Sequence, residues 1–126
     1  MNSYDADRKP NHNAWLGLDE DTKIDLVVAY HRRRHPRTPQ IRLHATFHTI
    51  VENQLAANGP VVVETLERLR NEGLSRHDAV HAIGSVLAAH LYDALKREQP
   101  DAGQDLNEAY AAELRKLTAE SWHNAG

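Results

Sequence analysis

The chain has 126 residues, 40% of them hydrophobic, and a formal net charge of −3 with its nine histidines counted as neutral. This length and apolar content predict a single domain with one core, and the negative charge argues against a nucleic-acid partner. Cysteine is absent, which excludes disulfides, thiolate metal ligands and cysteine nucleophiles. Any metal must therefore be held by nitrogen and oxygen atoms.

No part of the sequence is typical of a membrane or export segment. Its apolar runs fall short of the ~18 residues of a membrane span, and residues 1–5 lack the hydrophobic region of a signal peptide. We therefore expect a cytoplasmic protein that does not engage a membrane. The basic run from Arg32 to Arg37 is interpreted as the solvated end of a helix rather than as a phosphate-binding patch.

The N-terminal part is expected to be a mobile tail followed by a helix. Residues 1–13 are polar and contain Pro10, which favours a flexible segment ahead of one helical domain over residues 14–126. The first helix is predicted from about Asp19 to Arg34, because its acidic start and basic end match the helix dipole. Its buried stripe is expected to contain Ile24, Val27, Val28 and His31.

The second predicted helix carries the feature around which the rest is organised. It is expected to begin with Thr38 as its cap and Pro39 in its first turn, and to end at Asn58-Gly59. At about 100° per residue, its inner face combines apolar side chains with two imidazoles and a carboxylate on successive turns, namely His44, His48 and Glu52. What partners these three groups is the main question that the sequence raises.

A third helix is predicted from Pro60 to about Glu72, ended by Gly73. The fourth and longest opens with a capping box at Ser75 and extends to about Glu98. Its inner face is expected to hold His77, Val80, His81, Gly84, Leu87, Leu91 and Leu95.

A last helix is predicted from Asp105 to about Trp122. The fold class is therefore all-α, a bundle of about five helices with short connections. Gly84 costs about 1 kcal/mol relative to alanine within a helix. We expect a close approach of another backbone to explain its presence.

The histidines on the inner faces suggest a metal site. Two pairs with i, i+4 spacing lie on separate helices, and imidazoles one turn apart can reach a common ion. We predict His44, His48, His77 and His81 as the core ligands. His31 and Glu52 are expected as additional ligands or as groups that orient a ligand ring. Imidazole suits zinc, iron, copper or nickel, and zinc or iron is the preferred ion.

The alternative is a buried polar network in a non-catalytic interaction module, as a monomer or as a homodimer. A single histidine on an apolar face is usually a core residue satisfied by protein groups. Five buried and unpaired imidazoles at about 1–3 kcal/mol each would, however, rival the whole stability of a small domain. Phosphate loops, nucleophile elbows and the HExxH motif are absent, so catalysis and any small-molecule substrate stay unassigned.

The sequence resembles two known groups. Tyr30-His31, the two histidine pairs, Glu52-Asn53-Gln54 and Arg76-His77-x3-His81-Ala82-Ile83-Gly84 are similar to a family of small bacterial helical proteins known only as a domain of unknown function. A weaker resemblance is to hemerythrin-like bundles, which implies iron held by His31, His48, Glu52, His77 and His81. The last helix departs from that pattern and offers only Glu113 as a bridging carboxylate.

Overall fold

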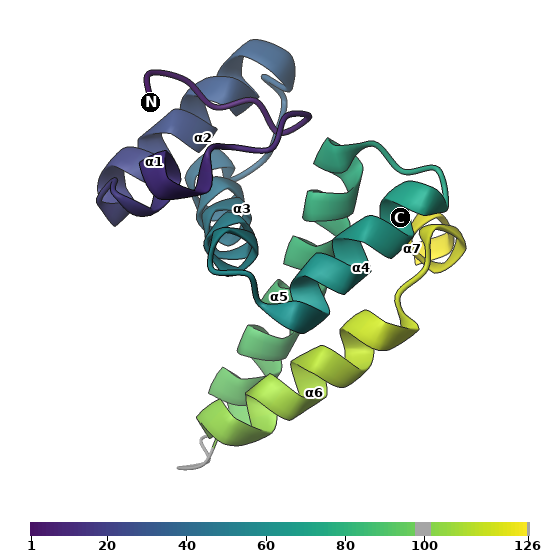
Figure 1. Cartoon of the computed structure of the whole chain (residues 1–126). Coiled ribbons are helices and arrows are strands. Elements are labelled where there is room, and N and C mark those ends of the chain that lie inside the picture. Colours follow the sequence, from purple (N-terminus) through teal and green to yellow (C-terminus); the bar gives the residue numbers. More distant parts are fainter. Residues whose placement is uncertain (98–101, 126) are drawn as a thin grey trace.

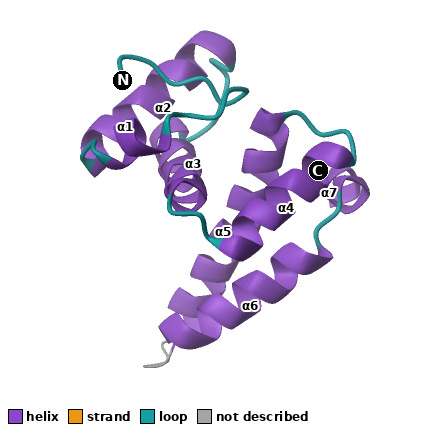
Figure 2. Ribbon diagram, in the orientation of Figure 1, coloured by secondary structure: helices purple, strands orange, loops and turns teal. Residues whose placement is uncertain are grey.

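The computed structural model describes residues 1–97 and 102–125, and these residues form seven helices and no strand (Figure 1). Figure 2 shows that loops make up the rest, which confirms the predicted all-α fold. Five longer helices match the predicted ones: α2 (Glu20–Arg34), α3 (Ile41–Ala56), α4 (Pro60–Asn71), α5 (Arg76–Arg97) and α6 (Ala102–Lys116). Two short helices, α1 (His12–Leu16) and α7 (Ala119–Ala125), were not predicted.

The helix ends follow the local chemistry of the sequence. Asp19 caps α2 by accepting a hydrogen bond of 2.7 Å from the Thr22 amide. Ser75 caps α5 in the same way, at 3.1 Å from the Asp78 amide. Gly73 adopts a φ of +105°, which favours glycine, directly after α4. These caps fix where α2 and α5 begin, and both helices carry histidines.

The single last helix predicted from Asp105 to Trp122 is wrong in extent, because the chain breaks between α6 and α7. The Thr118 hydroxyl accepts a hydrogen bond of 2.9 Å from the Ser121 amide and so caps α7. One residue of α4 and the residue that follows this helix stabilise the junction. Arg68 donates to the carbonyls of Leu114 and Leu117, and Glu72 accepts from the Ala119 amide at 2.8 Å.

Helix α3 lies between two apolar clusters. It packs on α2 and α1 on one side and on α5 and α4 on the other, while α6 covers α4 and α5. One cluster includes Trp15, Val27, Val28 and Ala45, and the other includes Val51, Leu69, Val80 and Ile83. The first half of α3, with its histidines, is therefore brought between α2 and α5. Among the described helices, none combines the length and the apolar content needed to cross a bilayer.

The N-terminal segment does not behave as the mobile tail that the sequence suggested. Tyr4 and Ala6 are buried, and the Tyr4 ring packs 5.7 Å from Trp15 and 5.6 Å from Tyr30, measured between ring centroids. The carbonyl of Ala6 also accepts a hydrogen bond of 3.0 Å from Arg76. A few apolar side chains and one buried partner are enough to fix a segment whose composition is mostly polar.

The far end of α5 also differs from expectation. Leu95, predicted to be buried, has 78% of its surface exposed, and Tyr92 has 58%. Of the described helices, α6 alone lies beside this end of α5 (Figure 1). The apolar periodicity of α5 therefore continues where no second described helix covers it.

Candidate metal centre

Imidazole rings from three regions of the chain meet where α2, α3 and α5 come together. His44 and His48 of α3 have ring centroids 4.5 Å apart. His31 of α2 lies 4.8 Å from His48, and His81 of α5 lies 4.8 Å from His44. His77, one turn before His81, lies 5.8 Å from His48. The structure thus brings together the two predicted histidine pairs and His31.

The ring nitrogens are close enough to form two groups of three. One group is His31, His48 and His77, and the other is His44, His48 and His81. Within each group, one nitrogen from each ring lies within 4.8 Å of the other two. His48 belongs to both groups and is 1% exposed, so it is the centre of the cluster.

Several buried nitrogens in the cluster have no hydrogen-bond partner among residues 1–97 and 102–125. They are Nε2 of His31, both ring nitrogens of His48 and Nε2 of His77. A buried polar atom without a partner costs about 1–3 kcal/mol, and such atoms are rare in native proteins. The protein groups that the structure describes therefore leave these four nitrogens unsatisfied.

Neighbouring oxygen atoms orient two of the rings. Nδ1 of His31 lies 2.9 Å from the carbonyl oxygen of Val27. Because a carbonyl can only accept, Nδ1 carries the proton and Nε2 keeps its lone pair. Nδ1 of His77 lies 3.4 Å from the Asp78 carboxylate, which again leaves Nε2 as the free atom. In both rings Nε2 carries the free lone pair, and Nε2 is also the nitrogen without a hydrogen-bond partner. This arrangement is typical of histidine ligands to metals.

Burial keeps the rings neutral. Burial, and after it the neighbouring histidines, lowers the pKa of His44 to about 4. The same two causes place the pKa of His48 well below its usual value, and burial likewise lowers the pKa of His31, His77 and His81. Neutral imidazole is the form that binds a metal ion, so at pH 7 the rings are already in the binding form.

A small cavity of about 80 Å³ adjoins the group of His44, His48 and His81. Its wall on α5 is made of small residues, Gly84, Ser85 and Ala88. We expected another backbone close to Gly84, but this is wrong. A Cβ built there would meet only side-chain atoms of Phe47 and Val51, both at 3.9 Å. The absence of larger side chains instead leaves space beside these three rings.

Glu52 is not part of either histidine group, although the sequence suggested it as a ligand. Its two carboxylate oxygens accept hydrogen bonds from Arg76, at 2.7 Å and 2.8 Å, and Tyr4 donates a further one. Burial raises the pKa of Tyr4, so that its hydroxyl keeps the proton that it donates. Arg76 and Tyr4 therefore occupy three of the about four lone-pair positions of this carboxylate, which disfavours Glu52 as a metal ligand.

Residues outside the predicted set also border the cluster. His35, which follows α2, stacks on His77 with ring centroids 4.5 Å apart and planes inclined by 12°. Trp122 of α7 places its ring 5.8 Å from His81. Periodicity could not identify His35, because it lies beyond the last helical turn. Glu113, considered as a bridging carboxylate, is exposed and lies 3.7 Å from Lys116.

Comparison with protein-family models, with curated proteins and with solved structures finds no match to this chain.

Proposed function

We propose that this protein binds a transition-metal ion, zinc or iron, through its buried histidine cluster. The ligands come from the five rings that form the two groups, and His48 is the ring that both groups share. Imidazole nitrogen suits both metals. The observation that carries the proposal is the set of four buried ring nitrogens without partners, on three neutral rings that converge.

The competing hypothesis, a polar network that serves only structure, requires donors and acceptors around the rings. The Val27 carbonyl and Asp78 each pair with one ring nitrogen. The amide side chains of Asn53 and Gln54 on α3, however, are used elsewhere. Asn53 accepts a hydrogen bond of 2.9 Å from the Trp15 indole, and Gln54 accepts one of 2.8 Å from Tyr110. A metal ion satisfies several nitrogen lone pairs at once, which supports the proposal over the network.

The test is metal analysis of protein purified without an affinity tag. We expect stoichiometric zinc or iron in the wild type, and strongly reduced metal in His48→Ala and in His77→Ala. Matched controls are His90→Ala and His123→Ala, which alter histidines outside both groups and should keep the metal content of the wild type. Equal loss from all four variants would mean adventitious binding, and a metal-free wild type that takes up no added ion would refute the proposal.

A further inference from the structure

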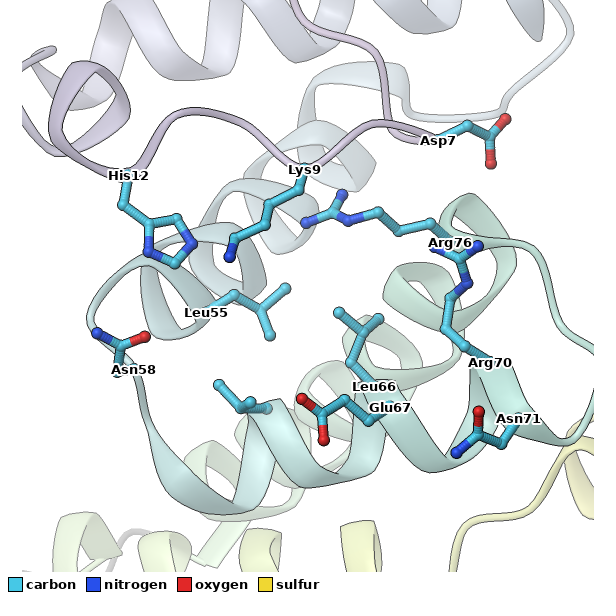
Figure 3. A pocket seen from close by; sticks show the side chains of 11 residues that line it. Asp7, Lys9, His12, Leu55, Asn58, Leu66, Glu67, Arg70, Asn71 and Arg76 are labelled. Carbon is cyan, nitrogen blue, oxygen red and sulfur yellow. The ribbon is translucent and has the colours of Figure 1, made fainter.

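A pocket of about 640 Å³ lies between the N-terminal segment, the end of α3 and α4 (Figure 3). This volume is in the range of small-molecule sites, roughly 300–1,000 Å³. Leu55, Val63 and Leu66 give it an apolar lining, and Lys9, Arg70 and Arg76 give it cationic groups. None of the five candidate metal ligands lines it, so this is a separate site.

Arg76 has unused hydrogen-bond donors at this pocket. Of its five N–H groups, two on Nη1 donate to Ala6 and Glu52, and one on Nη2 donates to Glu52. The remaining N–H groups, on Nε and Nη2, lie along one edge of the planar guanidinium. Arg76 is only 4% exposed, and it is one of the residues that line this pocket. The pocket is therefore the space in which we place a partner for the free edge.

An edge of two parallel N–H groups matches the two oxygens of a carboxylate. Figure 3 shows Lys9 and Arg76 on the same side of the pocket, across from Leu66 and Glu67. Lys9 and Arg70 form no ion pair within the described part of the chain. The preformed guanidinium edge and two free cations thus favour an anionic head group beside an apolar body.

The acidic residues of the lining restrict the charge of the ligand. Asp7 is already engaged, since its carboxylate accepts a hydrogen bond of 3.1 Å from the His77 amide. Glu67 faces the pocket and would repel a second negative charge. We propose that this pocket binds a small organic monocarboxylate, with the carboxylate on Arg76 and Lys9 and the apolar body against Leu55 and Leu66.

The test is a titration of the full, chelator-treated protein with hexanoate, followed by NMR shifts of backbone amides. Removing metal first prevents the carboxylate from binding an ion in the histidine cluster. We expect shifts at Lys9, Leu66 and Arg76, and at least about tenfold weaker binding of hexan-1-ol, which has the same chain without the charge. Inorganic phosphate, which lacks the apolar body and carries more charge, should bind more weakly than hexanoate.

Exposed residues of the pocket provide variants that keep the fold. Lys9→Gln should weaken hexanoate severalfold, and Glu67→Gln should strengthen it severalfold. Glu64→Gln makes the same charge change on α4 outside the pocket and should leave the affinity unchanged. Equal binding of hexanoate and hexan-1-ol, no binding of either, or indifference to Lys9→Gln would overturn the proposal. None of these outcomes bears on the metal content, which is measured separately.

Discussion

Two buried polar clusters lie side by side on the same two helices, and they differ in how their groups are paired. In the first, Glu52 of α3 is held by Arg76 of α5 and by Tyr4. In the second, His48 lies one turn before Glu52, and His77 directly follows Arg76. The ion-pair cluster satisfies its charges with protein groups, while the histidine cluster leaves four buried nitrogens without partners.

This difference separates a buried carboxylate that protein groups already hold from buried ring nitrogens that still lack a partner. Both places hold polar side chains that are about 1% exposed, Glu52 in the first and His48 in the second, so neither burial nor polarity alone indicates function. What distinguishes the histidine cluster is the missing partner, because a fold tolerates an unsatisfied buried group only when something else stabilises it. The predictions below test this comparison, from the largest expected effect to the smallest.

The largest effect is expected from breaking the ion-pair cluster. Arg76→Ala leaves the Glu52 carboxylate buried without its main partner and should lower the free energy of unfolding by about 3–5 kcal/mol. Denaturant unfolding of the metal-free protein measures this. The control is Arg42→Ala, which removes an exposed pair at 3.0 Å from Asp25 and should cost at most about 1 kcal/mol. Similar losses in the two variants would contradict the assignment.

The next effect is that of the ion on the histidine cluster. An ion bound only to the folded protein adds about 2.7 kcal/mol at a free concentration one hundred times its Kd. A chelator should therefore lower the melting temperature at pH 7.5, and the difference should shrink towards pH 5 as protons compete for the nitrogens. Superimposable melting curves for metal-loaded and metal-free protein would show that the ion contributes no stability.

The metal-free protein should itself lose stability in mild acid. The pKa of His44 is about 4 in the fold, against about 6.5 when unfolded, and the other four rings shift in the same direction. Between these values the unfolded chain binds more protons than the folded one. Stability is thus fully present above pH 6.5 and declines as the pH falls towards 4. Urea unfolding across this range checks the slope, and a flat profile would contradict the burial of neutral rings.

The smallest effect on stability is expected at the centre of the histidine cluster. His48→Leu replaces two unpartnered nitrogens with an apolar side chain, so that the metal-free variant should be as stable as the wild type or about 1 kcal/mol more stable. It should nevertheless lose the metal. A destabilisation comparable to that of Arg76→Ala would mean that His48 has a structural partner after all.

Much of the histidine cluster was predictable from the sequence, but the neighbouring cluster of Glu52, Arg76 and Tyr4 was not. Helical spacing places His44, His48 and Glu52 on one face, and it does the same for His77 and His81, because this is local geometry. Which groups stand opposite depends on residues distant in the sequence. Arg76 lies 24 positions after Glu52 and Tyr4 lies 48 before it. Spacing alone therefore suggested Glu52 as an additional ligand or as a group that orients a ligand ring.

The same limit explains the other differences. The mostly polar composition of residues 1–13 gave no sign that Tyr4 would be buried, because its burial depends on contacts with Trp15 and Tyr30. His35 reaches the histidine cluster through the turn after α2, and no periodic pattern extends there. Patterns within one helix are fixed by the sequence nearby, while contacts between elements depend on how the whole chain packs.

The position of Trp122 gives the protein an optical reporter of its own histidine cluster. The chain has two tryptophans, and Trp15 is fully enclosed beside Tyr4. Trp122 alone of the two lies against a cluster ring, His81, in a short helix whose first amide is held by Glu72. A metal ion with a partly filled d shell quenches indole emission at short range. Cobalt or copper bound in the histidine cluster should therefore quench the emission of Trp122 and leave that of Trp15 unchanged. Metal occupancy of the cluster can then be followed by tryptophan fluorescence without a label.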